Sequence, residues 1–388
     1  MDANRQIDEV FVANLQAARL QESMGASFEE VVGAYLRASD SAPHRSEALW
    51  GASRRCGLSN KFAEGYEYAR RGLTIERPAD GLCVEDWIYD YGLLDEFAVN
   101  AYWAGAYQDC LDACERLLRE GKIPSDERVR VTMNADFARQ KLSFQIQREI
   151  RDAFSLLRPY GVDEFNKLRF GAAHDGGYIL IDDFRGIDTA LSFGIGCDSS
   201  WDEAISERHV TVYQFDPTID SPPATDNRGL IFAKKKISGQ AGPDSESLAS
   251  LVTLHDKRNS HPNIMVKMDI ENDEWTVFDQ TSPEILARFC QIVVEFHFFN
   301  NPLDNYWRQI YARVFKKISD LYGVVHVHAN NYGEFINVGN VMIPNVFEVT
   351  FANRSIYSFK DTDEIFPGPL DRPNNPTCPD MYLGSFRF

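Results

Sequence analysis

The spacing of apolar residues along the chain changes near residue 145. Before this point, small and aromatic residues recur at helical spacing, which predicts an all-α domain over residues 1–145. Beyond it, short apolar runs alternate with helical patterns, which predicts an α/β domain over residues 146–388 with a mostly parallel sheet. A hairpin of residues 346–352 and 356–359 is expected to close the sheet. The other predicted strands are residues 178–181, 190–193, 210–215, 230–233, 264–268, 292–296 and 324–327.

The helical domain contains a repeated pattern. Intervals at residues 35–38 and 66–73 lead to Pro43 and Pro78, which are 35 residues apart, close to the roughly 34-residue period of tetratricopeptide repeats. A third interval leads to Pro124, 46 residues beyond Pro78, and its extra length is consistent with an insertion. Such units bury their apolar faces only by stacking, so helix pairs are expected to pack in series and to dock a protein partner or an acceptor. An irregular helical bundle is the alternative.

Composition narrows the function classes. The 388 residues carry a net charge of −18, which argues against nucleic-acid binding through a basic surface. No apolar run is long enough for a membrane span, and the first residues lack the pattern of a signal peptide. The seven cysteines are scattered, as is typical of reduced thiols, so a cytoplasmic protein is expected.

Two apolar runs of the α/β domain end in residues suited to nucleotide binding. The first run is followed by Gly194 and Gly196, and the second ends next to Asp216, 20 residues after Gly196. In doubly wound sheets such glycines let a nucleotide approach the backbone, and the acid accepts hydrogen bonds from ribose hydroxyls. An adenosine-containing cofactor is therefore predicted. A nicotinamide-dependent oxidoreductase is an alternative, which the fingerprint disfavours because Ser199 stands at its third glycine position.

A later stretch distinguishes between cofactors. The apolar run at residues 264–268 is followed by Asp269 and an acid-rich turn. With Lys267 it resembles the K-x-D-x-E-G motif of FkbM-type methyltransferases, except that Asn272 stands where glycine is usual. Asn tolerates a left-handed backbone better than most residues, so the turn is expected to form. Further similar stretches are the D-G-G-Y at residues 175–178, residues 248–251, the E-x-H at residues 295–297 and residues 345–350.

The resemblance covers about residues 165–360 and implies a class I methyltransferase, whose Rossmann-like sheet ends in an antiparallel hairpin. It implies S-adenosylmethionine as cofactor and methyl transfer, commonly to oxygen. The helical domain also resembles a segment of bacterial proteins that carry glycosyltransferase domains and tetratricopeptide repeats, which favours a sugar or glycan hydroxyl as acceptor. An inactive scaffold is the alternative, because Asn272 departs from the motif. The similar helical stretches are residues 35–38, 45–49, 89–96, 101–105 and 113–118.

The resemblance places cofactor-binding residues near the carboxyl ends of the strands. The two glycines are expected beneath the amino-acid part of the cofactor, and Asp216 at the ribose. Asp175 and Asp198 are candidates for the methionine ammonium group, with helix capping as the alternative for Asp198. Ile237 and its neighbour are assigned to the adenine edge by position alone. The full set is Asp175, Gly194, Gly196, Asp198, Asp216, Ile237, Ser238 and Asp269.

The candidate catalytic residues are Asp269, Glu295 and His297. Asp269 ends a strand on the ligand side of the sheet and is expected to contact cofactor and acceptor. Glu295 and His297 share strand parity, and His297 is the expected general base, with a hydrogen-bonded strand-end histidine as the alternative. The same three residues are a candidate site for Mg²⁺ or Mn²⁺. Glu271 and Asp273 are instead expected to place charge at the N-terminus of the following helix.

Two features lie toward the end of the chain. His326 and His328 share strand parity, and with Asn330 and Asn331 they are expected to line the acceptor pocket. Residues 367–379 contain five prolines and are predicted to form an extended loop.

Overall fold

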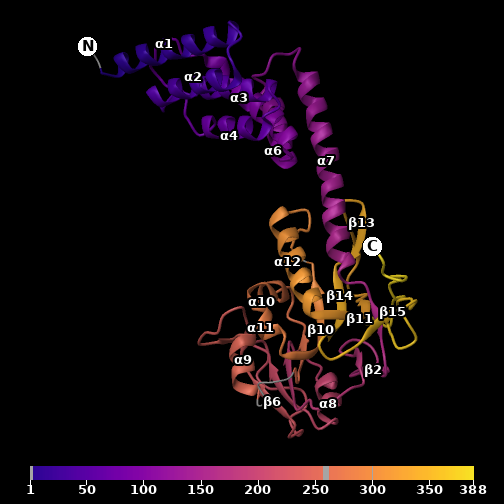
Figure 1. The fold of residues 1–388 in the computed structure, drawn as a ribbon. Helices are drawn as coiled ribbons and strands as arrows, with labels where there is room; N and C mark the ends of the chain where they lie inside the picture. The colour runs from indigo at the N-terminus through magenta and orange to yellow at the C-terminus, as the bar shows by residue number, and fades with distance from the viewer. Residues whose placement is uncertain (1–2, 257–261, 299) are drawn as a thin grey trace. The chain divides into compact units, whose positions relative to one another are not determined.

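The computed structural model describes residues 3–256, 262–298 and 300–388. It divides into two compact units, a helical unit of residues 1–145 and an α/β unit of residues 146–388 (Figure 1). None of the described helices combines the length and the apolar character that a membrane span requires.

The helical unit consists of helices that pack against their neighbours in the sequence. Its repeated prolines each follow a helix end, since Pro43 comes after α2 and Pro78 after α4. The expected insertion precedes α5 as a π-helical turn, η1, of Ile88–Gly92. The helices are α1 (Ala3–Ser23), α2 (Phe28–Ser41), α3 (Glu47–Leu58), α4 (Phe62–Gly72), α5 (Leu93–Ala104), α6 (Tyr107–Glu120) and α7 (Arg128–Ser155), of which α7 runs past the unit boundary.

Close approach of these helices depends on small residues. A Cβ at Gly51 of α3 would lie 2.3 Å from the ring of Tyr35 in α2, so only glycine fits there. A buried ion pair lies at the start of α3, where the Arg45 guanidinium is 2.6 Å from Glu47 Oε1 and both side chains are fully buried. The prediction of stacked helix pairs is confirmed at the level of a helical module, and the tetratricopeptide assignment stays a prediction.

The α/β unit is built on a seven-stranded sheet with the order β11-β14-β10-β9-β4-β5-β6. Strands β4, β5, β6, β9 and β10 are parallel, and β14 runs antiparallel to both β10 and β11. Every residue of β9 and β10 is buried, which explains why both strands are mostly apolar in the sequence. The strands are β4 (Thr189–Phe193), β5 (Thr211–Phe215), β6 (Leu230–Ala233), β9 (Ile264–Met268), β10 (Phe289–His297), β11 (Tyr322–Ala329) and β14 (Val346–Asn353).

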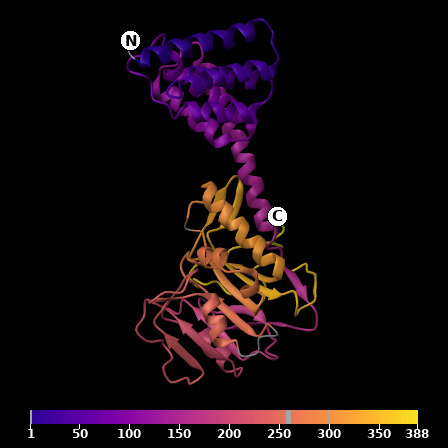
Figure 2. The same cartoon turned by 60° about the vertical axis from the view of Figure 1, so that its left-hand side comes forward.

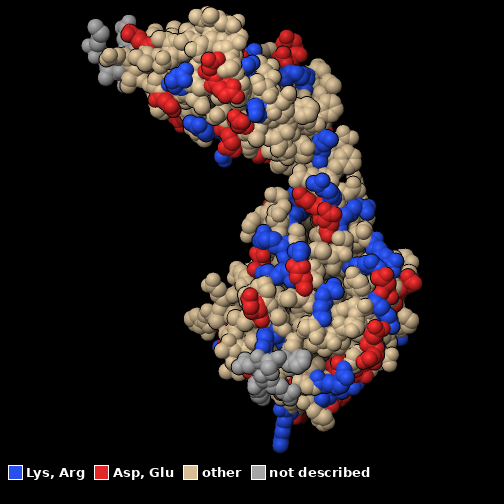
Figure 3. Space-filling view, viewed as in Figure 1, with Lys and Arg blue, Asp and Glu red and all other residues tan. Residues whose placement is uncertain are grey.

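Helices cover both faces of this sheet (Figures 1 and 2). On one face Trp201 of α8 shares a core with Ala190 and Val212 of the sheet. On the other face Trp275 of α10 stacks on Phe296 of β10 and meets the aromatic side chains of α12. The helices are α8 (Ser200–Ser206), α9 (Leu248–His255), α10 (Glu274–Gln280), α11 (Pro283–Leu286) and α12 (Asn305–Leu321). On the face that Figure 3 shows, basic and acidic side chains are interspersed.

The predicted closing hairpin of residues 346–352 and 356–359 is wrong. β14 instead has β10 on one side and β11 on the other. All eight residues of β14 are buried, and a strand buried in this way needs partners along both edges. The segment after it forms β15 (Phe359–Asp361), which pairs with β1 (Tyr160–Val162) in a separate sheet. The closing antiparallel pair is therefore β11–β14, and the small hairpin β12 (Phe335–Val338) and β13 (Val341–Pro344) lies in its connection.

The prediction that residues 178–181 belong to the parallel sheet is also wrong. These residues form β3 (Tyr178–Ile181), which pairs antiparallel with β2 (Lys167–Phe170) outside the main sheet. The Gln291 side chain of β10 bonds both the amide and the carbonyl of Ile181, at 2.9 and 3.0 Å. The Gln291 side chain thus makes the hydrogen bonds to the β3 backbone that a neighbouring strand would otherwise make. The remaining short pair is β7 (Lys236–Ile237) with β8 (Ser245–Glu246).

Candidate functional site

A cavity of about 530 Å³ opens at the carboxyl ends of β4, β5 and β9. In open α/β sheets this edge is where ligands bind, next to the point at which the strand order reverses. Of the eight predicted cofactor residues, only Ser238 does not line the cavity; its hydroxyl donates to the Gln240 carbonyl. The seven that line it are Asp175, Gly194, Gly196, Asp198, Asp216, Ile237 and Asp269.

The glycine turn after β4 requires its first glycine for two reasons. Gly194 has a φ of +75°, which L side chains rarely adopt. A Cβ at this position would also lie 1.6 Å from the carbonyl oxygen of Asp269. The Lys267 ammonium donates to the Gly194 carbonyl at 2.7 Å, from a side chain that is almost fully buried. The turn after β4 is therefore locked against the turn after β9.

Asp216 shapes the same turn. Its Oδ2 accepts from the amides of Ile195 and Gly196, both at 2.8 Å. Its Oδ1 accepts from the amide and the hydroxyl of Thr218, at 2.7 and 2.6 Å. Burial raises the pKa of this carboxyl, but these hydrogen bonds outweigh it and the pKa is lowered. A carboxylate has about four lone-pair positions, so a ribose hydroxyl would have to replace one of these donors, most simply the Thr218 hydroxyl.

Asp198 and Asp175 line the cavity beside this turn. Asp198 Oδ1 accepts from the amide of Ser200, the first residue of α8, at 2.6 Å. This contact fits the alternative that Asp198 caps the helix. Asp175 Oδ1 accepts from Asn374 Nδ2 at 3.1 Å. Each carboxylate is engaged through one oxygen, so both retain acceptor capacity toward a cationic ligand in the cavity.

Tyr178, for which no role was predicted, links two of the predicted catalytic acids. Its hydroxyl lies 3.2 Å from Asp269 Oδ2 and 3.4 Å from Glu295 Oε2. Burial, together with the charges of these acids, raises the pKa of the Tyr178 hydroxyl well above its ordinary value, so it remains a donor. Burial and the neighbouring charge of Asp269 raise the pKa of Glu295 to about 8. The only sequence signal for Tyr178 was its place in the D-G-G-Y stretch.

His297 is held between carboxylates at the end of β10. Its Nδ1 lies 3.1 Å from Glu274 Oε1, and its Nε2 lies 3.5 Å from Glu295 Oε1. Burial lowers the pKa of this imidazole, but Glu274 and Glu295 outweigh it and raise the pKa to about 11. The contacts of His297 fit the alternative of a hydrogen-bonded strand-end histidine, and its role as general base stays a prediction.

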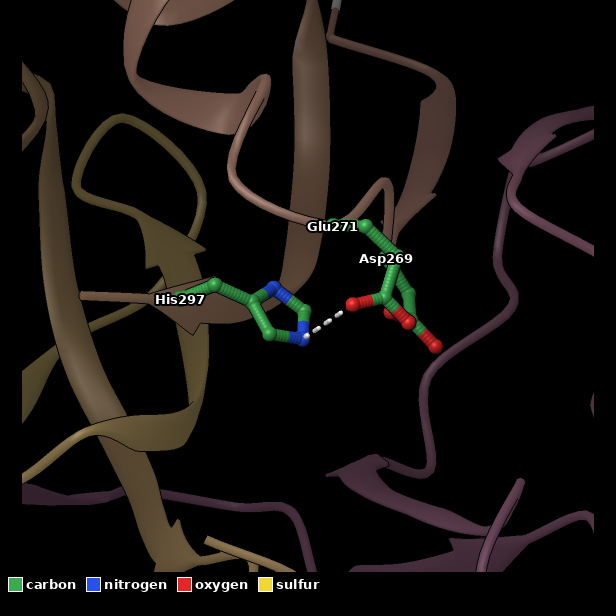
Figure 4. Close-up of side chains that lie close together, drawn as sticks. All are labelled: Asp269, Glu271 and His297. Carbon is green, nitrogen blue, oxygen red and sulfur yellow. Dashed lines mark ion pairs between the residues drawn. The ribbon is translucent and has the colours of Figure 1, made fainter. Parts of the chain in front are cut away.

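Glu271 does not take the helix-terminal position that the sequence analysis favoured. Glu271 and Asn272 both have left-handed backbones, with φ of +54° and +83°, which confirms the expected tolerance of Asn272 for this turn. The turn directs the Glu271 carboxylate toward His297, with Oε2 3.7 Å from Nε2. Asp269, Glu271 and His297 converge (Figure 4), and one ligand atom from each lies within 4.8 Å of the others. The third member of this possible metal-binding group is therefore Glu271 and not Glu295, which was predicted.

The two histidines of β11 do not line this cavity, and their place in an acceptor pocket stays a prediction. His328 Nδ1 lies 3.1 Å from Glu348 Oε2 and its Nε2 lies 3.1 Å from Asp380 Oδ1. His326 Nε2 lies 2.8 Å from Asp371 Oδ1. Both rings therefore hold the C-terminal segment against the sheet edge.

Of the two asparagines that follow β11, Asn331 also holds the C-terminal segment, and Asn330 bonds the carboxylate of Glu295. Asn331 bonds the backbone of the C-terminal segment, including the Asn375 carbonyl at 3.0 Å, and Asn330 donates to Glu295 Oε1 at 3.0 Å. The proline-rich segment is irregular, as predicted, but it is fastened by these contacts.

The fold and the cavity together define an α/β protein with a helical module and a cavity at the carboxyl edge of its sheet. No family model matches the chain, and a search of curated proteins found no match. One similar solved structure is a mutant O-GlcNAc transferase of Thermobaculum terrenum, 13% identical, with a TM-score of 0.27. That similarity covers 69% of this chain and 46% of the other, so the chain spans less than half of that protein. A TM-score this low supports no argument about fold or function.

Proposed function

We propose that this protein is a methyltransferase that transfers the methyl group of S-adenosylmethionine to a hydroxyl group, with a sugar or glycan as the acceptor. The observation that carries the proposal is the strand order of the sheet, combined with a cavity that the glycine turn after β4 lines.

The strand order favours this cofactor over a nicotinamide. Dinucleotide-binding sheets have six parallel strands in the order 3-2-1-4-5-6. Here β6-β5-β4-β9-β10 reproduces the first five positions, and antiparallel β14 is inserted before β11. A parallel sheet closed by an antiparallel pair is the layout of class I methyltransferases. The position of the third fingerprint glycine is Ser199, whose hydroxyl donates to Glu203 within the helix region.

The lining of the cavity fits the parts of S-adenosylmethionine. The cavity volume of about 530 Å³ lies within the usual range for small-molecule sites. The carboxylates of Asp175 and Asp198 suit the ammonium group of the methionine part, and Asp216 with Thr218 suits the ribose hydroxyls. Ile237 supplies an apolar contact for the adenine.

Methyl transfer needs an acceptor oxygen in line with the carbon–sulfur bond of the cofactor. The oxygen lone pair forms the new bond to the methyl carbon, and the electrons of the broken bond remain on sulfur. The acceptor O–H bond breaks, and its proton passes to a carboxylate at the site. Asp269 lines the cavity, so its carboxylate is placed to receive the proton, and the Tyr178 hydroxyl lies 3.2 Å from it.

The helical unit is proposed to dock the acceptor or a protein partner. The Trp103 side chain is 63% exposed and stacks on Phe62, with ring centroids 5.5 Å apart. Trp103 and Phe137 also line a cavity of about 300 Å³ within this unit. Exposed aromatic side chains around a hollow are typical of interaction sites.

Calorimetric titration of the full chain with S-adenosylmethionine, its demethylated product and NADH tests the proposal. We expect the first two to bind, and Asp175→Asn to weaken binding by about 10- to 100-fold through loss of a charge-assisted hydrogen bond. Glu207→Gln, a change in an exposed acid at the end of α8, is the control and should bind as the wild type does. Binding of NADH alone would support the oxidoreductase, and a folded protein that binds none of the three would support the inactive scaffold.

A further inference from the structure

We propose that Asp269, Glu271 and His297 bind a divalent cation of the Mg²⁺ or Mn²⁺ type at the edge of the cofactor cavity. This inference deepens the proposed function and rests on it for the cation's role in catalysis, whereas cation binding itself is tested separately. The three residues offer two carboxylates and one imidazole, with one ligand atom from each within 4.8 Å of the others. Oxygen-rich sets with one imidazole suit hard divalent cations such as Mn²⁺.

The orientation of His297 is the first independent support. Its Nδ1 lies 3.1 Å from Glu274 Oε1, so its Nε2 is the nitrogen on the side of Glu271 and Glu295, 3.7 and 3.5 Å from their carboxylate oxygens. The Ile270 amide fixes the same Glu274 oxygen at 2.8 Å, and Trp275 Nε1 donates to the His297 carbonyl at 2.6 Å. A carboxylate behind the far nitrogen is how proteins orient metal-binding histidines. A cation at Nε2 would displace the proton there.

The distances between the three ligand atoms are the second support. Two ligands of one small cation, each about 2.1 Å from it, lie at most about 4.2 Å apart. The observed span of up to 4.8 Å therefore needs only a small contraction. Glu271 can supply it, because its side chain is 77% exposed and free to change rotamer, whereas His297 is 3% exposed. The left-handed backbone at Glu271 and Asn272 already turns that carboxylate back toward the ring.

The position of the site indicates its role. Asp269 and Glu271 line the cavity proposed for the cofactor, and His297 lies just behind them. A cation held there would be beside the proposed acceptor position, where it could ligate one or two adjacent hydroxyls of a sugar. Such a ligand both orients the acceptor and makes its oxygen easier to deprotonate.

The test is a Mn²⁺ titration of the metal-free full chain, with free Mn²⁺ followed by electron paramagnetic resonance. We expect one Mn²⁺ per wild-type chain and at least about 10-fold weaker binding by Glu271→Gln, since even outer-shell changes cost this much. Glu284→Gln alters an exposed acid of α11 and should leave Mn²⁺ binding unchanged. Asp269→Asn is the second variant, with circular dichroism to show that it is folded.

Each result has a defined meaning. Failure of the wild-type chain to bind Mn²⁺, or equal binding by Glu271→Gln and the wild type, would overturn the cation site. S-adenosylmethionine binding is measured in EDTA with the same samples, so the two proposals are separable. A chain that binds the cofactor but not Mn²⁺ would retain the proposed function without the cation, and a chain that binds Mn²⁺ but not the cofactor would retain the cation site alone.

Discussion

The two glycines of the turn after β4 provide a matched pair for testing the structure. Both have left-handed backbones, with φ of +75° at Gly194 and +54° at Gly196. Alanine at either position therefore incurs the left-handed cost of about 1–2 kcal/mol. Only Gly194 faces a backbone atom, because its Cβ would lie 1.6 Å from the Asp269 carbonyl oxygen. Among the described residues nothing lies within 4 Å of a Cβ at Gly196.

We expect Gly196→Ala to lower the free energy of unfolding of the α/β unit by about 1–2 kcal/mol. Gly194→Ala should cost about 1–3 kcal/mol more, the range for forcing an extra methyl group into a packed region. Urea denaturation followed by circular dichroism measures both values, with the wild type in parallel. Equal destabilisation by the two substitutions would refute the argument that the turns after β4 and β9 are in contact.

The same pair separates stability from cofactor binding. Gly196 lines the cavity, so its alanine variant should fold well but bind S-adenosylmethionine more weakly if the proposed function holds. Unchanged binding by folded Gly196→Ala would mean that the cofactor does not pass close to this turn.

Two further predictions concern buried polar groups. Tyr178→Phe removes the hydroxyl that Asp269 and Glu295 share, and it should lower the free energy of unfolding in urea denaturation by about 1–3 kcal/mol. Tyr332→Phe, at an exposed tyrosine, is the control and should have little effect. Similar losses of stability in the two variants would refute the bridging role of Tyr178. Burial lowers the pKa of His328, but Glu348 and Asp380 outweigh it and raise the pKa to about 10. The stability that protonated His328 contributes should thus be complete below about pH 6.5, its unfolded pKa, and be lost as the pH rises toward 10. Unfolding free energies from pH 6 to 10 should fall less steeply for His328→Asn than for the wild type, and parallel curves would contradict this assignment.

Much of the sheet could be predicted because its strands are marked locally. The runs at residues 230–233 and 264–268 are strands with these bounds, and the run at residues 190–193 differs from its strand by one residue. The position of the site was predictable for a related reason: the carboxyl ends of parallel strands meet at one edge, so residues that follow different strands come together. Gly194, Asp216 and Asp269 follow three different strands and line one cavity.

The sequence was least informative where a partner is distant along the chain. Residues 178–181 would be an apolar run in any sheet, and the main-sheet side chains that bond their backbone, Gln291 and Thr350, lie 110 and 171 residues away in the sequence. His328 was expected to line the acceptor pocket, and the partner of its Nε2, Asp380, lies 52 residues later in the sequence. None of these contacts leaves a periodic signal, since a side-chain hydrogen bond constrains single positions and not a pattern.

By itself the sequence determined the two-unit organisation, the helical character of the first unit, most strands of the second and the edge of the sheet where a ligand would bind. These features follow from hydrophobic periodicity, turn residues and the common direction of parallel strands. Only the tertiary structure decided which strand closes the sheet, which acid accompanies Asp269 and His297, and which carboxylates surround the His297 ring. Those outcomes depend on burial and on charges within a few ångströms, and the fold brings such neighbours together from separate parts of the chain.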